Sequence, residues 1–267
     1  MNDPPSLLPA VTVVVPVYNS ADQLGSLVKA IDEAMAAGAL AQAASAEVIF
    51  VNDASRDGSW GRIVQLAERY PWVRGLDLSI NVGQHAALIE GASVASGDVI
   101  VTMDDDLQHP PEEIGKLLEA LRRGPTNGGA SASLVYGTPM SRGPLGLRRA
   151  GSCFARLGLA WRMRSLVALR SSAFRAFDAR LVPALARFDQ GSINLDAALV
   201  AVGARATSVR TVHGASHCPQ SRYGLLTLVR AAGAVFRGPR LGPRSASGPL
   251  RISAKVGFPV SAGPPTS

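Results

Sequence analysis

Residues 99–113 of this chain read V-I-V-T-M-D-D-D-L-Q-H-P-P-E-E, and this stretch decides the fold. Its first five residues are apolar or β-branched, which is typical of a strand buried on both faces of a parallel sheet. The proline pair and the two glutamates that follow are typical of the start of a helix. The carboxylates in between are therefore predicted to lie at the carboxyl end of a strand, where open α/β sheets bind their ligands.

The same carboxylates have the chemistry of a metal site. Side chains alternate along an extended chain, so Asp104 and Asp106 share one face and Asp105 takes the other. Two carboxylates and the Gln108 amide suit Mg²⁺ or Mn²⁺, which bind few protein oxygens and take further ligands from substrate phosphates. A solvated acidic loop at a helix start is the alternative, but the flanking strand and helix favour the metal site.

The chain as a whole alternates strands and helices. Apolar runs predict strands at 11–17, 47–51, 73–78, 99–103, 134–137 and 205–212, and helical patterns at 58–70, 84–95, 110–123, 151–169, about 178–188 and about 193–202. This order predicts a Rossmann-like, mostly parallel sheet flanked by helices. The amphipathic pattern at 151–169 suits a core helix or an interfacial membrane helix, and 224–236 is a second candidate for membrane contact. Residues 237–267, rich in Pro, Gly, Ser and Arg, are predicted to be a disordered basic tail.

Charge divides the chain into two unequal halves. Residues 1–139 carry 8 Lys and Arg against 17 Asp and Glu, a net charge of −9, whereas residues 140–267 carry 19 against 3, a net charge of +16. An arginine-rich second half indicates an anionic partner, with a codon bias toward arginine as the alternative. Nucleic acid is not expected, because the basic half contains no helix-turn-helix, zinc or aromatic RNA-binding pattern.

Location follows from features that the sequence lacks. The first nine residues do not form a charged and then apolar signal segment, so export is not expected. No run of about 18 apolar residues predicts a transmembrane helix. Cys153 and Cys218 lie far apart without metal spacing, which favours a reducing compartment.

Seven segments together resemble one family, the GT-A-fold family 2 glycosyltransferases that transfer sugars to polyprenyl phosphates. This group includes dolichol-phosphate mannose synthases and undecaprenyl-phosphate aminoarabinose transferases. The resemblance covers about residues 10–236 and implies one domain at 1–236, with a nucleotide-sugar and metal half at 10–138 and an acceptor half at 139–236. The segments are V-V-V-P-V-Y-N around Pro16, V-N-D-A-S around Asp53, L-S-I-N-V-G-Q-H-A-A around Gly83, M-D-D-D-L-Q-H-P-P-E-E from Met103, Y-G-T around Gly137, A-F-R-A-F around Arg175 and Q-S-R-Y before Gly224.

The resemblance implies roles for individual residues. The nucleotide-sugar would be bound by Pro16, Tyr18, Asp53, Gly83 and Asp104, and the metal by Asp104, Asp106 and Gln108. The acceptor phosphate would be gripped by Arg142, Arg148, Ser152, Arg175 and Arg222. Of these, Asp104, Asp106, Arg142 and Arg148 would be the catalytic residues. Asn52 stands where the family has an acid, which leaves the choice between a UDP-linked and a GDP-linked donor open.

The implied reaction is an inverting transfer of a sugar from a nucleotide-sugar to undecaprenyl or dolichyl phosphate. The acceptor phosphate is anionic at neutral pH, so no general base is needed, and the four histidines, His85, His109, His213 and His217, are expected to be structural or to support other site residues. A glycosyltransferase acting on a hydroxyl of a specialised metabolite is the alternative, with Asp196 as the base. An inactive homologue that only binds at a membrane is another. The expected location is cytoplasmic, peripheral to the inner face of the plasma membrane, with a homo-oligomer or a membrane partner left open.

Overall fold

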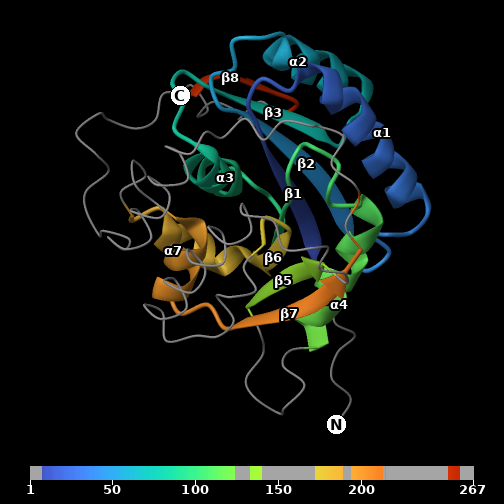
Figure 1. Cartoon of the computed structure of the whole chain (residues 1–267), viewed down its shortest axis with the longest axis vertical. Helices are drawn as coiled ribbons and strands as arrows, with labels where there is room; N and C mark the ends of the chain where they lie inside the picture. Colours follow the sequence, from blue (N-terminus) through green and yellow to red (C-terminus); the bar gives the residue numbers. More distant parts are fainter. Residues whose placement is uncertain are drawn as a thin grey trace, which may run out of the picture.

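The structure is a computed structural model that describes residues 8–123, 133–139, 172–188, 194–212, 214 and 252–258. These residues form one sheet with helices on both faces (Figure 1). The strands are β1 (Ala10–Val17), β2 (Ser45–Asn52), β3 (Val73–Leu78), β4 (Val99–Thr102), β5 (Leu134–Pro139), β6 (Arg175–Asp178), β7 (Ala206–Thr211) and β8 (Ile252–Val256). The helices are α1 (Ala21–Ala36), α2 (Ser59–Arg69), α3 (Gln84–Ser93), α4 (Ile114–Arg123), α6 (Val182–Leu185) and α7 (Leu195–Ala201), with short 3₁₀ turns at Pro111–Glu113 and Ala179–Leu181.

The strand order is β7-β5-β6-β4-β1-β2-β3-β8. Strands β4, β1, β2 and β3 run parallel to one another, as do β5 and β7, while β6 and β8 are antiparallel to their neighbours. The central strand β1 contains Val13, Val14 and Val15, all fully buried. β-branched side chains fill a sheet that is covered on both faces, which is why this run forms the middle of the sheet. The predicted mostly parallel, Rossmann-like sheet is confirmed.

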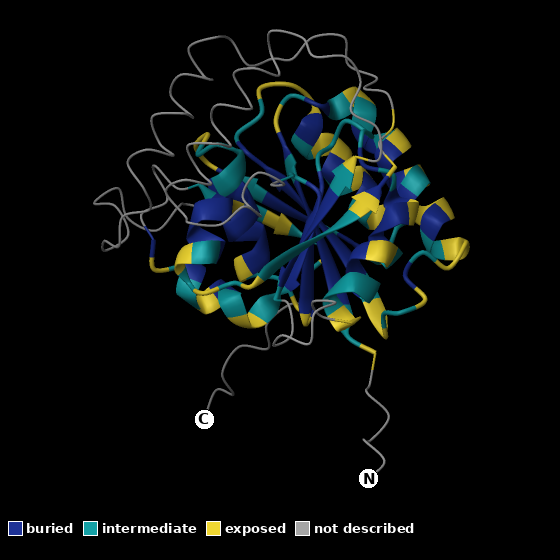
Figure 2. Cartoon of the chain, turned by 60° about the horizontal axis from the view of Figure 1, so that its bottom comes forward, coloured by how far each residue is buried: buried dark blue, intermediate teal, exposed yellow. Residues whose placement is uncertain are grey.

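Each face of the sheet has its own apolar core. One core joins β1, β2 and β4 to α1, α2 and α4, and the other joins the opposite faces of the strands to α3, α6 and α7. Figure 2 shows this arrangement as buried strands enclosed by helices with exposed outer faces. Helix α3 lies especially close to the sheet: a Cβ atom on Gly91 would stand 2.4 Å from Cγ1 of Val14 and 2.7 Å from Cγ2 of Val51. The helix therefore cannot shift toward the sheet.

Two strands differ from the sequence prediction. Residues 175–178 form β6, which pairs antiparallel with both β4 and β5, and the predicted helix at about 178–188 is reduced to a 3₁₀ turn and the single turn α6. The strand is only four residues long, so a local pattern does not identify it. Pairing with two neighbouring strands is what stabilises it.

The second difference lies in the segment predicted to be a disordered tail. Within it, residues 252–258 form β8 and a turn, and β8 pairs antiparallel with β3 at the edge of the sheet. Phe258 lies under the guanidinium of Arg74 and the ammonium of Lys255, at 5.2 and 5.5 Å. The prediction of disorder is wrong for these residues because an otherwise unpaired edge strand supplies backbone partners for them.

Several predictions fall outside the described residues. The amphipathic segments at 151–169 and 224–236 do so, and so do the acceptor residues Arg142, Arg148, Ser152 and Arg222. Among the helices that the structure does describe, none has the length and apolar character needed to cross a bilayer.

Candidate active site

The loop after β4 carries the predicted metal ligands. Asp106 accepts hydrogen bonds from Gln108, with 3.1 Å between Oδ1 and the backbone nitrogen and a second bond from Nε2 to Oδ2. Leu107 between them has φ of 61°, a left-handed conformation that folds the loop back on itself. The structure thus brings Asp106 and Gln108 into contact at the carboxyl edge of the sheet.

Asp104 is held from two sides. Its Oδ1 accepts from Nε2 of Gln84 at 2.6 Å, and its backbone N–H donates to Nδ1 of His109 at 3.3 Å. The pKa of Asp104 is raised to about 7, mainly by burial and next by the negative charges of Asp106 and Asp105, while Arg175 and the Gln84 hydrogen bond act in the opposite direction. A proton therefore competes for this carboxylate near neutral pH.

His109 connects the loop after β4, residues 103–109 and called the metal loop for its predicted ligands, to β6. Its ring is 5% exposed and stacks on Phe174, with 5.2 Å between ring centroids and 11° between planes. Phe174 directly precedes Arg175 in the chain. His109 has a supporting position in the loop, as the sequence analysis expects of the histidines.

Asp53 and Gly83, both predicted to bind the nucleotide, contact each other directly. Asp53 accepts backbone N–H groups from Val82 at 2.7 Å and from Gly83 at 2.9 Å. Burial raises the pKa of the Asp53 carboxyl, and these two hydrogen bonds act in the opposite direction. Gly83 has φ of 85°, which glycine adopts without strain. In this structure both Asp53 oxygens hold the turn before α3, a role that the sequence analysis does not assign to them.

Pro16 and Tyr18 lie on and just after β1, at the same edge of the sheet. Tyr18 is 42% exposed, and Pro16 is partly buried. The loop after Tyr18 contacts the loop after β2, because the backbone nitrogen of Asn19 donates to Oγ of Ser55 at 3.0 Å. Asn19 Oδ1 in turn accepts from the backbone nitrogen of Arg56 at 2.8 Å. The predicted nucleotide residues thus surround one edge of the sheet.

Arg175 and Asp196 form a buried ion pair. Arg175 is 2% exposed and Asp196 is 7% exposed. Oδ1 of Asp196 accepts from Nη1 of Arg175 and from the hydroxyl of Tyr136, the latter at 2.8 Å. Burial raises the pKa of Tyr136 well above its ordinary value, and the Asp196 carboxylate adds to this effect. The predicted acceptor arginine and the alternative general base therefore bind each other.

Residues 12–164 match the family model described as glycosyl transferase family 2. That match covers more than half of the 267 residues. The chain belongs to glycosyl transferase family 2.

Curated relatives within this family carry names of polyprenyl-phosphate transferases. A dolichol-phosphate mannosyltransferase from Pyrococcus furiosus is 40% identical over 43% of this chain and 30% of its own length. An undecaprenyl-phosphate 4-deoxy-4-formamido-L-arabinose transferase from Aeromonas hydrophila is 42% identical over 43% of this chain and 34% of its own length. The same-named protein from Erwinia tasmaniensis is 29% identical over 82% of this chain and 64% of its own length. The alignments thus span between 30% and 64% of the length of these relatives, less than two thirds in each case.

Solved glycosyltransferase structures share the fold. Glucosyl-3-phosphoglycerate synthase from Mycobacterium tuberculosis, bound to Mn²⁺, UDP and phosphoglyceric acid, superposes with a TM-score of 0.58 at 20% identity, over 85% of this chain and 76% of that chain. A mannosyltransferase from Pyrobaculum calidifontis, bound to GDP-Man and Mn²⁺, has a TM-score of 0.57 at 18% identity, over 80% of this chain and 59% of that chain. These likenesses establish the GT-A fold for this family 2 chain.

Two residues that contact the predicted site residues have no role in the sequence analysis. Gln84 lies within a quoted motif and Tyr136 begins another, while His85, beside Gln84, is expected there only in a supporting role. His85 accepts the backbone N–H of Leu195 on Nδ1 at 3.4 Å. Burial lowers the pKa of His85, which favours the neutral ring that such an acceptor requires. Their partners are 20 to 110 residues away in sequence, so no local pattern signals these contacts.

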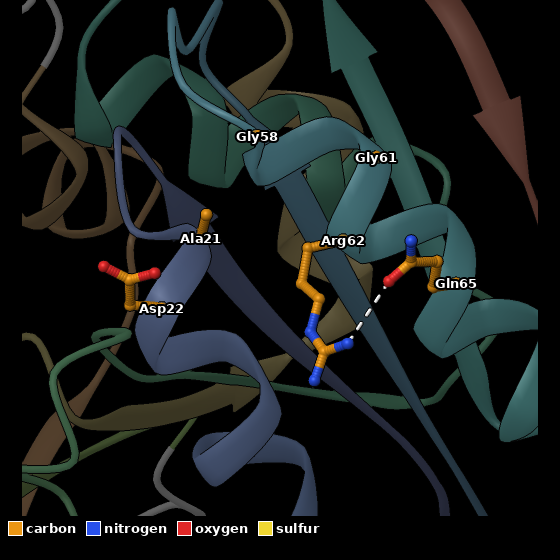
Figure 3. A pocket seen from close by; sticks show the side chains of 6 residues that line it. All are labelled: Ala21, Asp22, Gly58, Gly61, Arg62 and Gln65. Carbon is orange, nitrogen blue, oxygen red and sulfur yellow. Dashed lines mark hydrogen bonds between the residues drawn. The ribbon is translucent and has the colours of Figure 1, made fainter.

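A pocket of about 450 Å³ lies away from these residues (Figure 3). It is lined by Ala21, Asp22, Gly58, Gly61, Arg62 and Gln65. Arg62 crosses it and donates from Nη1 to Oε1 of Gln65 at 3.2 Å. None of the predicted site residues lines this pocket, which belongs to the contact between α1 and α2.

Proposed function

We propose that this family 2 chain transfers a sugar from a nucleotide-sugar to a polyprenyl phosphate, with inversion at the anomeric carbon. The observation that carries the proposal is the contact between two site elements at one edge of the sheet. Gln84 bonds the metal-loop residue Asp104, and the preceding residue, Gly83, bonds Asp53 on the nucleotide side. A diphosphate bound there would reach both elements. The names of the curated relatives supply the class of acceptor.

The donor set fits a hard divalent cation. In the described part of the chain, no three His, Cys, Asp or Glu side chains form a metal-binding group by themselves. Mg²⁺ and Mn²⁺ need only one or two protein carboxylates when a diphosphate supplies further oxygen ligands. Burial, and after it the charges of Asp106 and Asp105, raise the pKa of Asp104, and a bound cation would stabilise the ionised form of this carboxylate. Asp104, Asp106 and Gln108 would hold the ion, which offsets the charge on the departing diphosphate when bound.

The acceptor is proposed to be a phosphate because the chain offers no free base at Asp196. Its Oδ1 is engaged by both Arg175 and Tyr136 in a buried site. A hydroxyl acceptor would need a carboxylate that is free to take a proton. A phosphate acceptor is already anionic, since its second pKa is about 6 by analogy with phosphorylated side chains.

The protein's part in the reaction is then positioning and charge compensation. Arg142 and Arg148, with Ser152 and Arg222, would neutralise and aim the acceptor phosphate for in-line attack, and bidentate arginine contacts would fix its orientation. Arg175 would contribute its positive charge from a buried position, because its side chain is paired with Asp196. Pro16 and Tyr18 would contact the nucleotide. An inactive homologue is disfavoured, because the complete set of Asp104, Asp106 and Gln108 is present.

The lipid acceptor implies the location. A polyprenyl chain lies in a membrane, so we propose peripheral contact at the cytoplasmic face of the plasma membrane. The net charge of +16 on residues 140–267 would favour an anionic surface. The donor is a UDP-linked or a GDP-linked sugar, and a homo-oligomer or a membrane partner is compatible with either.

A transfer assay tests the proposal. UDP- and GDP-linked radiolabelled sugars are offered with Mn²⁺ or Mg²⁺ to two acceptors, undecaprenyl phosphate in detergent and a panel of soluble hydroxyl compounds. We expect label on the lipid phosphate, lost when a chelator is added. Label on hydroxyl acceptors alone would overturn the phosphate proposal. Transfer that continues in the presence of the chelator would overturn the proposal that the reaction depends on a metal ion.

A further inference from the structure

The start of helix α3 contacts three separate parts of the molecule through consecutive residues. Gly83 donates its backbone N–H to Asp53, at 2.9 Å, on the nucleotide side. Gln84 donates its side-chain amide to Asp104, at 2.6 Å, in the metal loop. His85 accepts the backbone N–H of Leu195, at 3.4 Å, at the start of α7.

Helix α3 behaves as a rigid connector between these contacts. Seven of its ten residues, from Ala86 to Ala92, are buried. Gly91 leaves no space against Val14 and Val51, so the helix packs directly on the sheet. Close-packed interiors transmit displacement instead of absorbing it. A shift at Gln84 is therefore also a shift at His85.

Helix α7 is the element that His85, at the start of α3, contacts. Its second residue, Asp196, holds Arg175 and Tyr136 in the buried cluster. Asn194 caps the helix by accepting the N–H of Ala197 at 3.0 Å. The N–H of Leu195 is a first-turn donor, which a helix cannot satisfy internally. His85 supplies its acceptor, so the placement of α7 depends on α3.

We propose that Gln84 and His85 are positioning residues that couple the metal loop to α7. Gln84 would orient Asp104 for the cation. Through its hydrogen bond to Leu195, His85 would make the position of α7, the helix that contains Asp196, depend on the position of α3. A carboxylate has two oxygens, so Gln84 and a cation can share Asp104. This inference rests on the proposed function only in requiring that the metal loop bind a cation together with a nucleoside diphosphate.

Hydrogen exchange of the full-length chain tests the coupling. Exchange across residues 194–201 is followed by mass spectrometry with and without Mn²⁺ plus UDP or GDP, and calorimetry gives the affinity of the same probes. We expect loading to slow exchange in this segment severalfold. His85→Leu should abolish the slowing and leave the affinity within about twofold, because His85 does not touch the metal loop. His85→Asn is the matched control: its amide oxygen replaces Nδ1 as acceptor and should restore most of the slowing.

The Gln84 contact is tested by the same calorimetry. Gln84→Ala should weaken Mn²⁺ binding by about tenfold, the usual effect of losing a group that orients a metal ligand. Equal slowing in His85→Leu and wild type, or unchanged Mn²⁺ affinity in Gln84→Ala, would overturn the coupling. Failure of the wild type to bind Mn²⁺ with either nucleotide would instead refute the proposed function, and the coupling with it.

Discussion

The metal loop and the Arg175–Asp196 cluster differ in how the charge of their carboxylates is balanced. In the metal loop, Asp104, Asp105 and Asp106 follow one another, and their mutual repulsion helps to raise the pKa of Asp104. In the cluster on the other side of α3, the single carboxylate of Asp196 is matched by Arg175 and a hydroxyl. The first region gathers negative charge that Arg175 offsets only in part, whereas in the second region the same arginine is paired directly with a carboxylate. The difference favours the first region as the place for the proposed cation and gives Asp196 the role of holding Arg175.

The largest expected effect comes from removing a ligand in the metal loop. Asp106→Ala should lower metal-dependent sugar transfer by at least about 100-fold, because the cation would lose one of its direct ligands. Loss of a residue that only orients a metal ligand already lowers metal affinity or activity by about 10- to 100-fold. Transfer rates against Mn²⁺ concentration measure the effect, and the melting temperature should change little because the residue lies in a loop. Asp22→Ala, which removes a carboxylate at the pocket between α1 and α2, is the control. Retained activity in Asp106→Ala would remove the metal assignment.

Breaking the matched pair should act on stability. Arg175→Met leaves the Asp196 carboxylate buried without its cation, which should cost about 3–5 kcal/mol in the free energy of unfolding. Urea denaturation measures it. The double variant Arg175→Met with Asp196→Leu should lose less than the two single variants together, since no buried charge remains. A single-variant cost below about 1 kcal/mol, the usual value of an exposed pair, would show that the cluster is open to solvent.

The pH dependence of cation binding sharpens the comparison further. The pKa of Asp104 is about 7, and the cation binds only the ionised carboxylate. Apparent Mn²⁺ affinity should therefore be level above the pKa and fall by up to about tenfold for each pH unit below it. Calorimetry at pH 6 and pH 8, in buffers of different ionisation enthalpy, measures both the affinity and the released proton. An affinity that does not change across this range would contradict the raised pKa.

The smallest expected effect concerns the hydroxyl of the matched cluster. Tyr136→Phe removes one of the two donors to Asp196 but keeps the ion pair, so it should cost about 1 kcal/mol, the typical net contribution of one hydrogen bond. Urea denaturation beside Arg175→Met gives the comparison. If Tyr136→Phe lowered the free energy of unfolding as much as Arg175→Met, the Tyr136 hydroxyl and not the Arg175 guanidinium would be the main partner of the Asp196 carboxylate.

Local patterns predicted the frame of the sheet well. Strands β1 to β5 and β7 lie where the sequence indicated them, because each contains several apolar or β-branched residues within a short segment bounded by turn residues. Strands β6 and β8 were missed. Both are short, and both exist through pairing with distant strands, β4 and β5 for one and β3 for the other.

The candidate site shows the same division. The contact between Asp106 and Gln108 spans two residues, and a loop of that spacing is readable in the sequence. The Asp196 contacts were not readable, because Tyr136 and Arg175 are 60 and 21 residues from it in the chain. Sequence reasoning consequently assigned Arg175 and Asp196 to separate roles, an acceptor contact and a base, while the structure pairs them.

The amino-acid sequence alone indicated which strand ends in carboxylates, where several helices begin, and which family the chain belongs to. These follow from periodicity, turn residues and motifs, all of which act over a few neighbouring residues. The tertiary structure alone decided which of those groups meet. It joined Gln84 to Asp104 and His85 to Leu195, and it enclosed Arg175 with Asp196. The physical reason is that side-chain contacts across a folded sheet depend on strand order and helix packing, which no local pattern encodes.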